Sequence, residues 1–112
     1  MSEVVVVGSF KAQPGKEAEA LEAFKALVEP THGEEGCILY ALHQGNDDPA
    51  RMAFVERWES RELLDAHLKS AHVAKALERA EELFGDSADI VVYDAVPGGE
   101  TKKGSLADHA AG

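Results

Sequence analysis

One short segment carries two residues, Glu56 and Trp58, whose types are suited to chemistry. Alternate residues of a strand point to the same side, so Phe54, Glu56 and Trp58 would share one face of the run Met52 to Trp58. If that face is buried, the Glu56 carboxylate needs a partner, because an isolated charge in an apolar site shifts its pKa or destabilises the fold. Two interpretations stay open: Glu56 is a proton acceptor in a site, or a structural hydrogen-bond acceptor.

A second candidate is His67, which lies about one helical turn after Leu63 and Leu64 and directly before Leu68. This spacing places the imidazole on the apolar face of a helix, directed toward the sheet. Histidine exchanges protons near neutral pH, so His67 and Trp58 converging on one pocket would suit general acid–base chemistry. The same spacing is consistent with a hydrogen-bonded core histidine.

Further aromatic and histidine side chains extend the candidate set. Tyr40 and Trp58 have apolar bodies with one polar tip, which suits a pocket for a flat aromatic ligand and equally suits a core. His72 follows His67 by five residues, about 140° around a continuous helix, so the pair predicts only a weak metal site. The catalytic candidates are His67 and Trp58, and the substrate-binding candidates are Tyr40, Phe54, Glu56 and His72.

No pattern in the sequence is typical of a bound cofactor. We find no His-Glu-x-x-His motif, no facial triad, no glycine-rich phosphate loop and no dinucleotide fingerprint. Cys37 is the one cysteine, which excludes an internal disulfide and a thiolate cluster for a metal. We therefore expect neither a metal nor an organic cofactor.

Hydrophobic periodicity predicts the elements that position these residues. Apolar runs predict strands, and apolar residues three or four apart predict helices. Ser60 is a good N-cap, and Pro30 and Gly85 are residues that end helices. The predicted order is a strand over 4–10, a helix over 16–30, strands over 37–44 and 52–58, helices over 60–69 and 70–84, and a strand over 90–96.

This order is the split βαβ pattern, which predicts an α+β fold of ferredoxin-like topology with helices on one face of a four-stranded antiparallel sheet. A sheet with one wet face alternates apolar and polar residues, yet the runs 4–7 and 90–93 are apolar throughout. The helices cover one face, so a second copy of the sheet is the simplest cover for the other. We expect a homodimer, the alternative being that such short apolar runs arise by chance.

Composition and charge narrow the class of partner. The 112 residues predict one domain over 1–96, and the tail 97–112 has too few large apolar residues to order itself. A formal charge of -10, from 11 Lys and Arg against 21 Asp and Glu, disfavours nucleic acid and anionic membranes as partners. Neither a membrane-spanning run nor a signal-peptide pattern is present, so we expect a cytoplasmic protein.

Several of these residues also form a recognisable pattern. Its parts are Glu35-Gly36-Cys37-x-x-Tyr40, Phe54-x-Glu56-x-Trp58, Ser60 with Leu63 and His67, and His72. In this pattern the chain resembles the antibiotic biosynthesis monooxygenase family over residues 4–96. The resemblance implies a dimeric α+β barrel that oxidises phenolic, anthrone-like or quinol substrates with molecular oxygen, without metal or flavin. It also implies that Trp58 and His67 line the substrate cleft.

The chemistry of such a reaction assigns roles to these side chains. His67 would take a proton from a phenol, the Trp58 indole N–H would donate to a substrate oxygen, and an apolar wall would exclude water. The same scaffold hosts isomerases of small carbonyl compounds, haem-degrading enzymes and non-catalytic dimers that bind small molecules. A haem enzyme would use His67 as axial ligand, but the first-strand asparagine typical of that subgroup is replaced here by Gly8 or Ser9.

Overall fold

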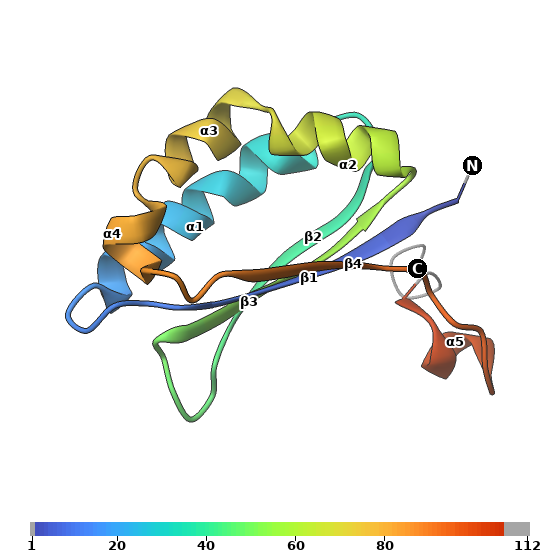
Figure 1. Ribbon diagram of the computed structural model, residues 1–112. Helices are drawn as coiled ribbons and strands as arrows, with labels where there is room; N and C mark the ends of the chain where they lie inside the picture. The colour runs from blue at the N-terminus through green and yellow to red at the C-terminus, as the bar shows by residue number, and fades with distance from the viewer. Residues whose placement is uncertain (1, 107–112) are drawn as a thin grey trace.

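Four strands form one antiparallel sheet in the order β2-β3-β1-β4, and the helices α1 to α4 lie on one of its faces (Figure 1). The computed structural model describes residues 2–106. Its elements are β1 (Val4–Lys11), α1 (Glu17–His32), β2 (Cys37–Gln44), β3 (Arg51–Trp58), α2 (Arg61–Leu68), α3 (Ala71–Leu77), α4 (Ala80–Phe84), β4 (Asp89–Tyr93) and α5 (Thr101–Gly104). The predicted α+β fold of ferredoxin-like topology is confirmed.

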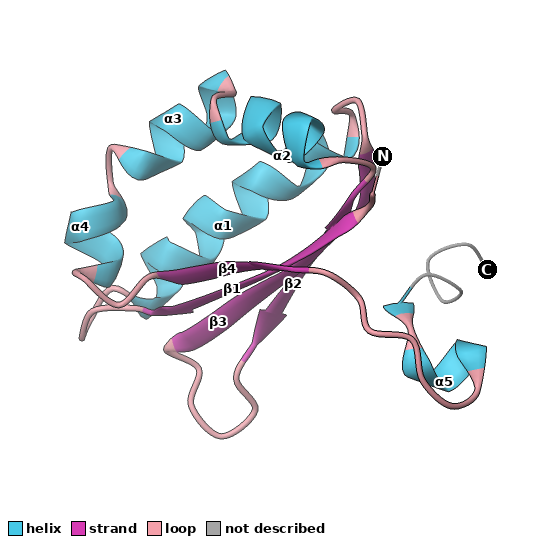
Figure 2. Ribbon diagram, turned by 45° about the vertical axis from the view of Figure 1, so that its right-hand side comes forward, coloured by secondary structure: helices cyan, strands magenta, loops and turns pink. Residues whose placement is uncertain are grey.

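The core lies between the sheet and the helix layer, which Figure 2 shows nearly edge-on. Phenylalanine rings fill its centre: Phe24 of α1 stacks on Phe84 of α4 at 4.5 Å between ring centroids and meets Phe54 of β3 edge-on at 4.9 Å. Such aromatic pairs contribute beyond the area they bury. The helix-facing residues of β1 and β3, among them Val6 and Phe54, are almost fully buried.

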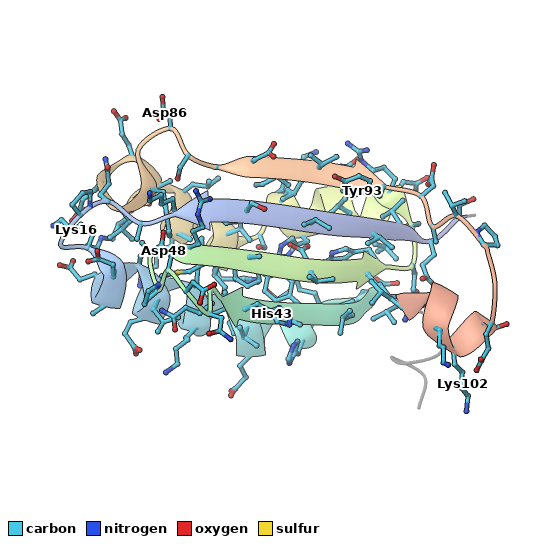
Figure 3. All side chains as sticks on the ribbon, turned by 90° about the horizontal axis from the view of Figure 1, so that it is seen from below. Lys16, His43, Asp48, Asp86, Tyr93 and Lys102 are labelled. Carbon is cyan, nitrogen blue, oxygen red and sulfur yellow. The ribbon has the colours of Figure 1, made fainter. Side chains whose placement is uncertain are left out.

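The other face of the sheet carries an apolar patch that is only partly covered. Figure 3 views this face, with Tyr93 and His43 labelled on it. Pairing Val5 with Tyr93 and Val7 with Val91 places four apolar side chains side by side, and Tyr93 keeps 49% of its surface exposed. The predicted two-sided apolar character of these strands is therefore present. We refer to this surface as the outer face.

Two predicted helix boundaries are wrong. Pro30 does not end α1, which continues to His32; a proline this near the end removes one hydrogen bond and leaves the last turn intact. The single helix predicted over 70–84 is broken into α3 and α4, because the chain turns at Glu78 and Arg79. The break redirects the chain so that Leu83 is buried at the core.

The last strand is shorter than predicted, since β4 ends at Tyr93 and not at Val96. Among the described strands its neighbour is β1, which begins at Val4; in the register that pairs Val5 with Tyr93, the residues after Asp94 have no strand to pair with, and Val96 is 83% exposed. Within the predicted disordered tail the structure describes the short helix α5, whereas residues 107–112 lie outside the described part of the chain. Among the described helices, none is long and apolar enough to cross a bilayer.

Candidate functional site

Strand β3 presents Phe54, Glu56 and Trp58 to the helix layer, and all three are buried. The alternation expected from the sequence therefore places the carboxyl group inside the fold. Trp58 Nε1–H donates a hydrogen bond of 2.9 Å to Glu56 Oε1. Burial raises the pKa of Glu56 to about 7; the bond from Trp58 opposes this rise, and the negative charge of Glu34 adds to it.

This hydrogen bond changes the expected role of Trp58. From the sequence, we expect the Trp58 indole N–H to donate to a substrate oxygen. In the structure this N–H donates to Glu56 instead. The Trp58 ring is fully buried and does not line the cavity described below. Indole nitrogen has one proton and no acceptor site, so it serves one strong partner at a time. Trp58 is thus placed behind Glu56 and not against a ligand.

Helix α2 places His67 over this part of the sheet. The helix starts at the predicted N-cap, because the Ser60 hydroxyl accepts from the backbone N–H of Leu63 at 3.2 Å. About two turns after Ser60, the His67 ring is buried between two aromatic rings, 4.7 Å from Trp58 and 5.3 Å from Tyr40 between centroids. The expected orientation of His67 toward the sheet is confirmed.

Glu34 sets the tautomer of a neutral His67. Its Oε2 lies 2.7 Å from His67 Nδ1, so a carboxylate there accepts the Nδ1–H and leaves Nε2 as the unprotonated nitrogen. Nε2 has no hydrogen-bond partner among the described residues. Among the side-chain nitrogen and oxygen atoms of the described chain, Arg57 Nη1 alone is both fully buried and without a hydrogen-bond partner. Nε2 of His67 has no such partner, so it is not fully buried. His67 therefore keeps an accessible proton acceptor.

Glu34, which lies in the short loop between α1 and β2, is not among the residues that the sequence predicts for the site. Nothing in its neighbourhood distinguishes it from Glu35, the next residue, which is exposed. Only its position beside α2 gives it a role, so spacing along the chain held no signal for it. Loop carboxylates that orient a histidine are found from the fold and not from a local pattern.

His72 lies on the far side of Glu34. Its Nε2 is 2.7 Å from Glu34 Oε2, the atom that also binds His67, and it contacts the hydroxyls of Thr31 at 3.2 Å and Ser70 at 3.3 Å. The expected separation of His67 and His72 around one helix was wrong, because α2 ends at Leu68 and the chain turns before α3. His72 does not line the cavity, so its expected contact with substrate finds no support in this placement.

An apolar cavity of about 150 Å³ lies between the sheet and the helices. Tyr40, Glu56 and His67 line it at one end, where Val6 and Tyr40 pair with Glu56 in the sheet. Phe10 and Phe84 line the other end, and among the described residues no Lys or Arg faces the cavity. Four of the six predicted site residues, namely Tyr40, Phe54, Glu56 and His67, thus line one cavity.

Two further groups near the cavity are held in their neutral forms. Burial, with the nearby charge of Glu56, raises the pKa of Tyr40 well above its usual range. Burial also raises the pKa of the Cys37 thiol to about 11, with smaller effects from Glu34 and Glu56. The proton-exchanging groups that face the cavity are therefore His67 and Glu56.

Comparison with known proteins agrees with this fold. Residues 3–79 match the family described as antibiotic biosynthesis monooxygenase. A Mycobacterium tuberculosis protein named "Putative monooxygenase Rv0793" is 32% identical over 83 residues, covering 74% of this chain and 81% of that protein. Its solved structure has a TM-score of 0.81 at 26% identity, covering 88% of this chain and 100% of that chain. An uncharacterised Synechocystis protein is 29% identical over 90 residues, 80% of this chain but 61% of its own length.

The fold and the site together define a small α+β protein with an imidazole and a carboxyl group at one end of an apolar cavity. The chain belongs to the antibiotic biosynthesis monooxygenase family. The match to the Synechocystis protein spans less than two thirds of that relative.

Proposed function

We propose that the protein is a monooxygenase that oxidises an uncharged phenol or quinol with molecular oxygen and needs no cofactor. The observation that carries this proposal is His67 at the cavity, with Nδ1 bound 2.7 Å from Glu34 and Nε2 free to accept a proton. A phenol at the polar end of the cavity would hand its hydroxyl proton to Nε2. The resulting phenolate is electron-rich enough to reduce oxygen directly.

The reaction balances without an external reductant. The phenolate transfers one electron to oxygen, and the radical pair combines at a ring carbon to form a peroxide. Loss of water leaves a quinone, so the ring hydrogen and the hydroxyl proton leave in the water molecule, and one oxygen atom remains in the product. Every electron comes from the substrate. The protein therefore has to bind the phenol, accept its proton and exclude solvent.

The remaining lining fits these tasks. With a pKa of about 7, Glu56 is partly protonated at neutral pH and is able to donate a hydrogen bond to a substrate oxygen or to the peroxide. The phenylalanine side chains of the cavity provide an apolar wall around the radical pair. A cavity of this size favours a ring system of one or two rings, and the lack of a lining cation disfavours a charged ligand.

The outer face supports the homodimer that the sequence suggests. Val5, Val7, Val91 and Tyr93 lie together on it, and exposed apolar patches of this kind mark association surfaces. We place the second copy of the chain on this face and the whole assembly in the cytoplasm.

Oxygen uptake by chelator-treated protein, given a panel of naphthols and naphthoquinols, tests the activity. Catalysed uptake that His67→Ala abolishes would support the proposal, and uptake no faster than without protein would contradict it. The second candidate is isomerisation of a small carbonyl compound, favoured by the presence of both His67 and Glu56 on one cavity. Turnover that continues under anaerobic conditions would identify the isomerase.

A further inference from the structure

Glu34, His67 and His72 form a cluster at the polar end of the cavity, and of the three only His67 lines the cavity itself. Glu34 comes from the loop before β2, His67 from the last turn of α2, and His72 from the first turn of α3. Their ligand atoms, Glu34 Oε2, His67 Nδ1 and His72 Nε2, all lie within 4.8 Å of one another. The turn between α2 and α3, which Figure 1 shows above the sheet, brings the two histidines together.

The donor set matches a known preference of metal ions. Two imidazoles and one carboxylate are the ligands of many zinc sites and of facial-triad sites, and the remaining positions hold water. A cation with bonds of about 2.1 Å holds neighbouring ligand atoms about 3.0–3.4 Å apart. The carboxylate oxygen lies 2.7 Å from each imidazole nitrogen, and the three atoms lie within 4.8 Å of one another, so side-chain rotations would have to bring them to these distances around an ion.

The surroundings also suit a bound cation. The side chains of Glu34 and His72 keep 18% and 24% of their surface exposed, which gives an ion a route from solvent. The hydroxyls of Thr31 and Ser70 contact the same atom, His72 Nε2, so an ion bound there would take the place of these two contacts. Among the described residues, no Lys or Arg forms an ion pair with Glu34. The close partners of its carboxylate are the two imidazole rings, so its charge is available to a cation.

We propose that Glu34, His67 and His72 bind a divalent late first-row cation such as Zn²⁺ through Oε2, Nδ1 and Nε2, and that the ion switches His67 from proton acceptor to donor. A neutral imidazole has one proton and one lone pair. With Glu34 on Nδ1–H, the lone pair is on Nε2 of a ring that lines the cavity. With the cation on Nδ1, the proton moves to Nε2, and His67 no longer accepts a proton from a ligand. If His67 accepts the substrate proton, the metal-bound protein should be inactive. This expected loss of activity rests on the proposed function, whereas the metal-binding site does not.

Calorimetric titration of untagged, chelator-treated protein with Zn²⁺ tests the site. We expect one ion per chain, and His72→Ala should weaken binding at least about tenfold because it removes a ligand. His43→Ala is the matched control, since His43 lies on the outer face and, within residues 2–106, its ring hydrogen-bonds to the backbone carbonyl oxygen of Ala41 alone. Circular dichroism of each variant shows that it is folded. Equal binding by wild type and His72→Ala, or no saturable binding by wild type, would overturn the proposal.

The switch has its own readout, which needs no substrate. In protein labelled with ¹⁵N-histidine, long-range ¹H–¹⁵N spectra distinguish the protonated from the unprotonated ring nitrogen. We expect His67 Nε2 to be unprotonated without metal and protonated with Zn²⁺. A His67 signal that Zn²⁺ leaves unchanged would overturn the switch. If the metal-free protein shows no oxygen uptake while binding and the tautomer change are present, the proposed function fails and the metal site stands.

Discussion

The indole N–H of Trp58 donates to the carboxyl group of Glu56, two residues earlier on the same face of β3, at 2.9 Å. This pair couples a core side chain to a group on the cavity wall. Through it, Trp58 influences the chemistry of the cavity without touching a ligand. It also gives Glu56 one fixed partner, so its second oxygen is the atom with freedom to meet a substrate.

Removing this donor should raise the pKa of Glu56 above about 7, because the bond from Trp58 holds it down. Trp58→Phe makes the change while keeping an aromatic ring, and ¹³C NMR titration of the glutamate carboxyl carbons measures it. Phe54→Leu is the control, since it alters packing on the same face and leaves the hydrogen bond in place. An unchanged Glu56 titration in Trp58→Phe would show that the bond does not set its protonation.

Glu56 should make stability depend on pH. Its pKa is raised from 4.5 to about 7 in the folded state, which means that folding favours the protonated carboxyl group. Its contribution to the free energy of unfolding is therefore fully present below about pH 4.5 and is lost as pH rises through about 7. Glu56→Gln still accepts from Trp58 and never ionises. The variant should match the wild type near pH 4.5 and exceed it at pH 8 by at most about 3 kcal/mol.

Urea unfolding at both pH values measures this difference. Glu59→Gln is the matched control, because Glu59 follows directly after β3 and is exposed. A Glu56→Gln variant that is less stable than the wild type at pH 8 would mean that the ionised carboxylate is better satisfied than its burial indicates.

Glu34→Gln should lower kcat with little change in KM. The amide cannot hold the Nδ1–H tautomer of His67 as a carboxylate does, so the fraction of His67 with an unprotonated Nε2 falls. We expect a loss of about 10–100-fold, smaller than the loss of about 10²–10⁴-fold for His67→Ala. Steady-state oxygen uptake measures both. Glu35→Gln, the exposed neighbour, should keep the wild-type kcat.

A charge on the outer face should separate the proposed dimer. Val55 pairs with Val7 and Ala41 in the centre of the sheet, so Val55→Asp would place a carboxylate among apolar side chains of both copies. Sedimentation velocity should show a dimer for the wild type and a monomer for Val55→Asp. Ala18→Asp, on the exposed side of α1, should remain dimeric. A wild-type monomer would contradict the proposed dimer.

Much of the fold could be predicted because its signals are local. Alternation in β3, the Ser60 cap and the spacing of Leu64 and His67 each depend on neighbours within a turn or two. Boundaries were less predictable where a distant element decides them. The end of β4 is set by where β1 begins, and the break before α4 brings Leu83 into the core.

The features of the site also divide into those that the sequence determines and those that only the tertiary structure decides. Sequence by itself determined the face of β3 that holds Glu56, the inward orientation of His67 and the apolar character of both sheet faces, because side-chain direction follows backbone periodicity. Tertiary structure alone decided that Glu34 meets His67, that the Trp58 donor is consumed by Glu56, and that His72 lies behind the cavity. The contacts of Glu34 with the two histidines join elements that are far apart along the chain, and no residue spacing encodes the angle at which the chain folds back. Trp58 and Glu56 are neighbours on one strand, and burial of that face by the helices removes the solvent that would otherwise compete for the indole N–H.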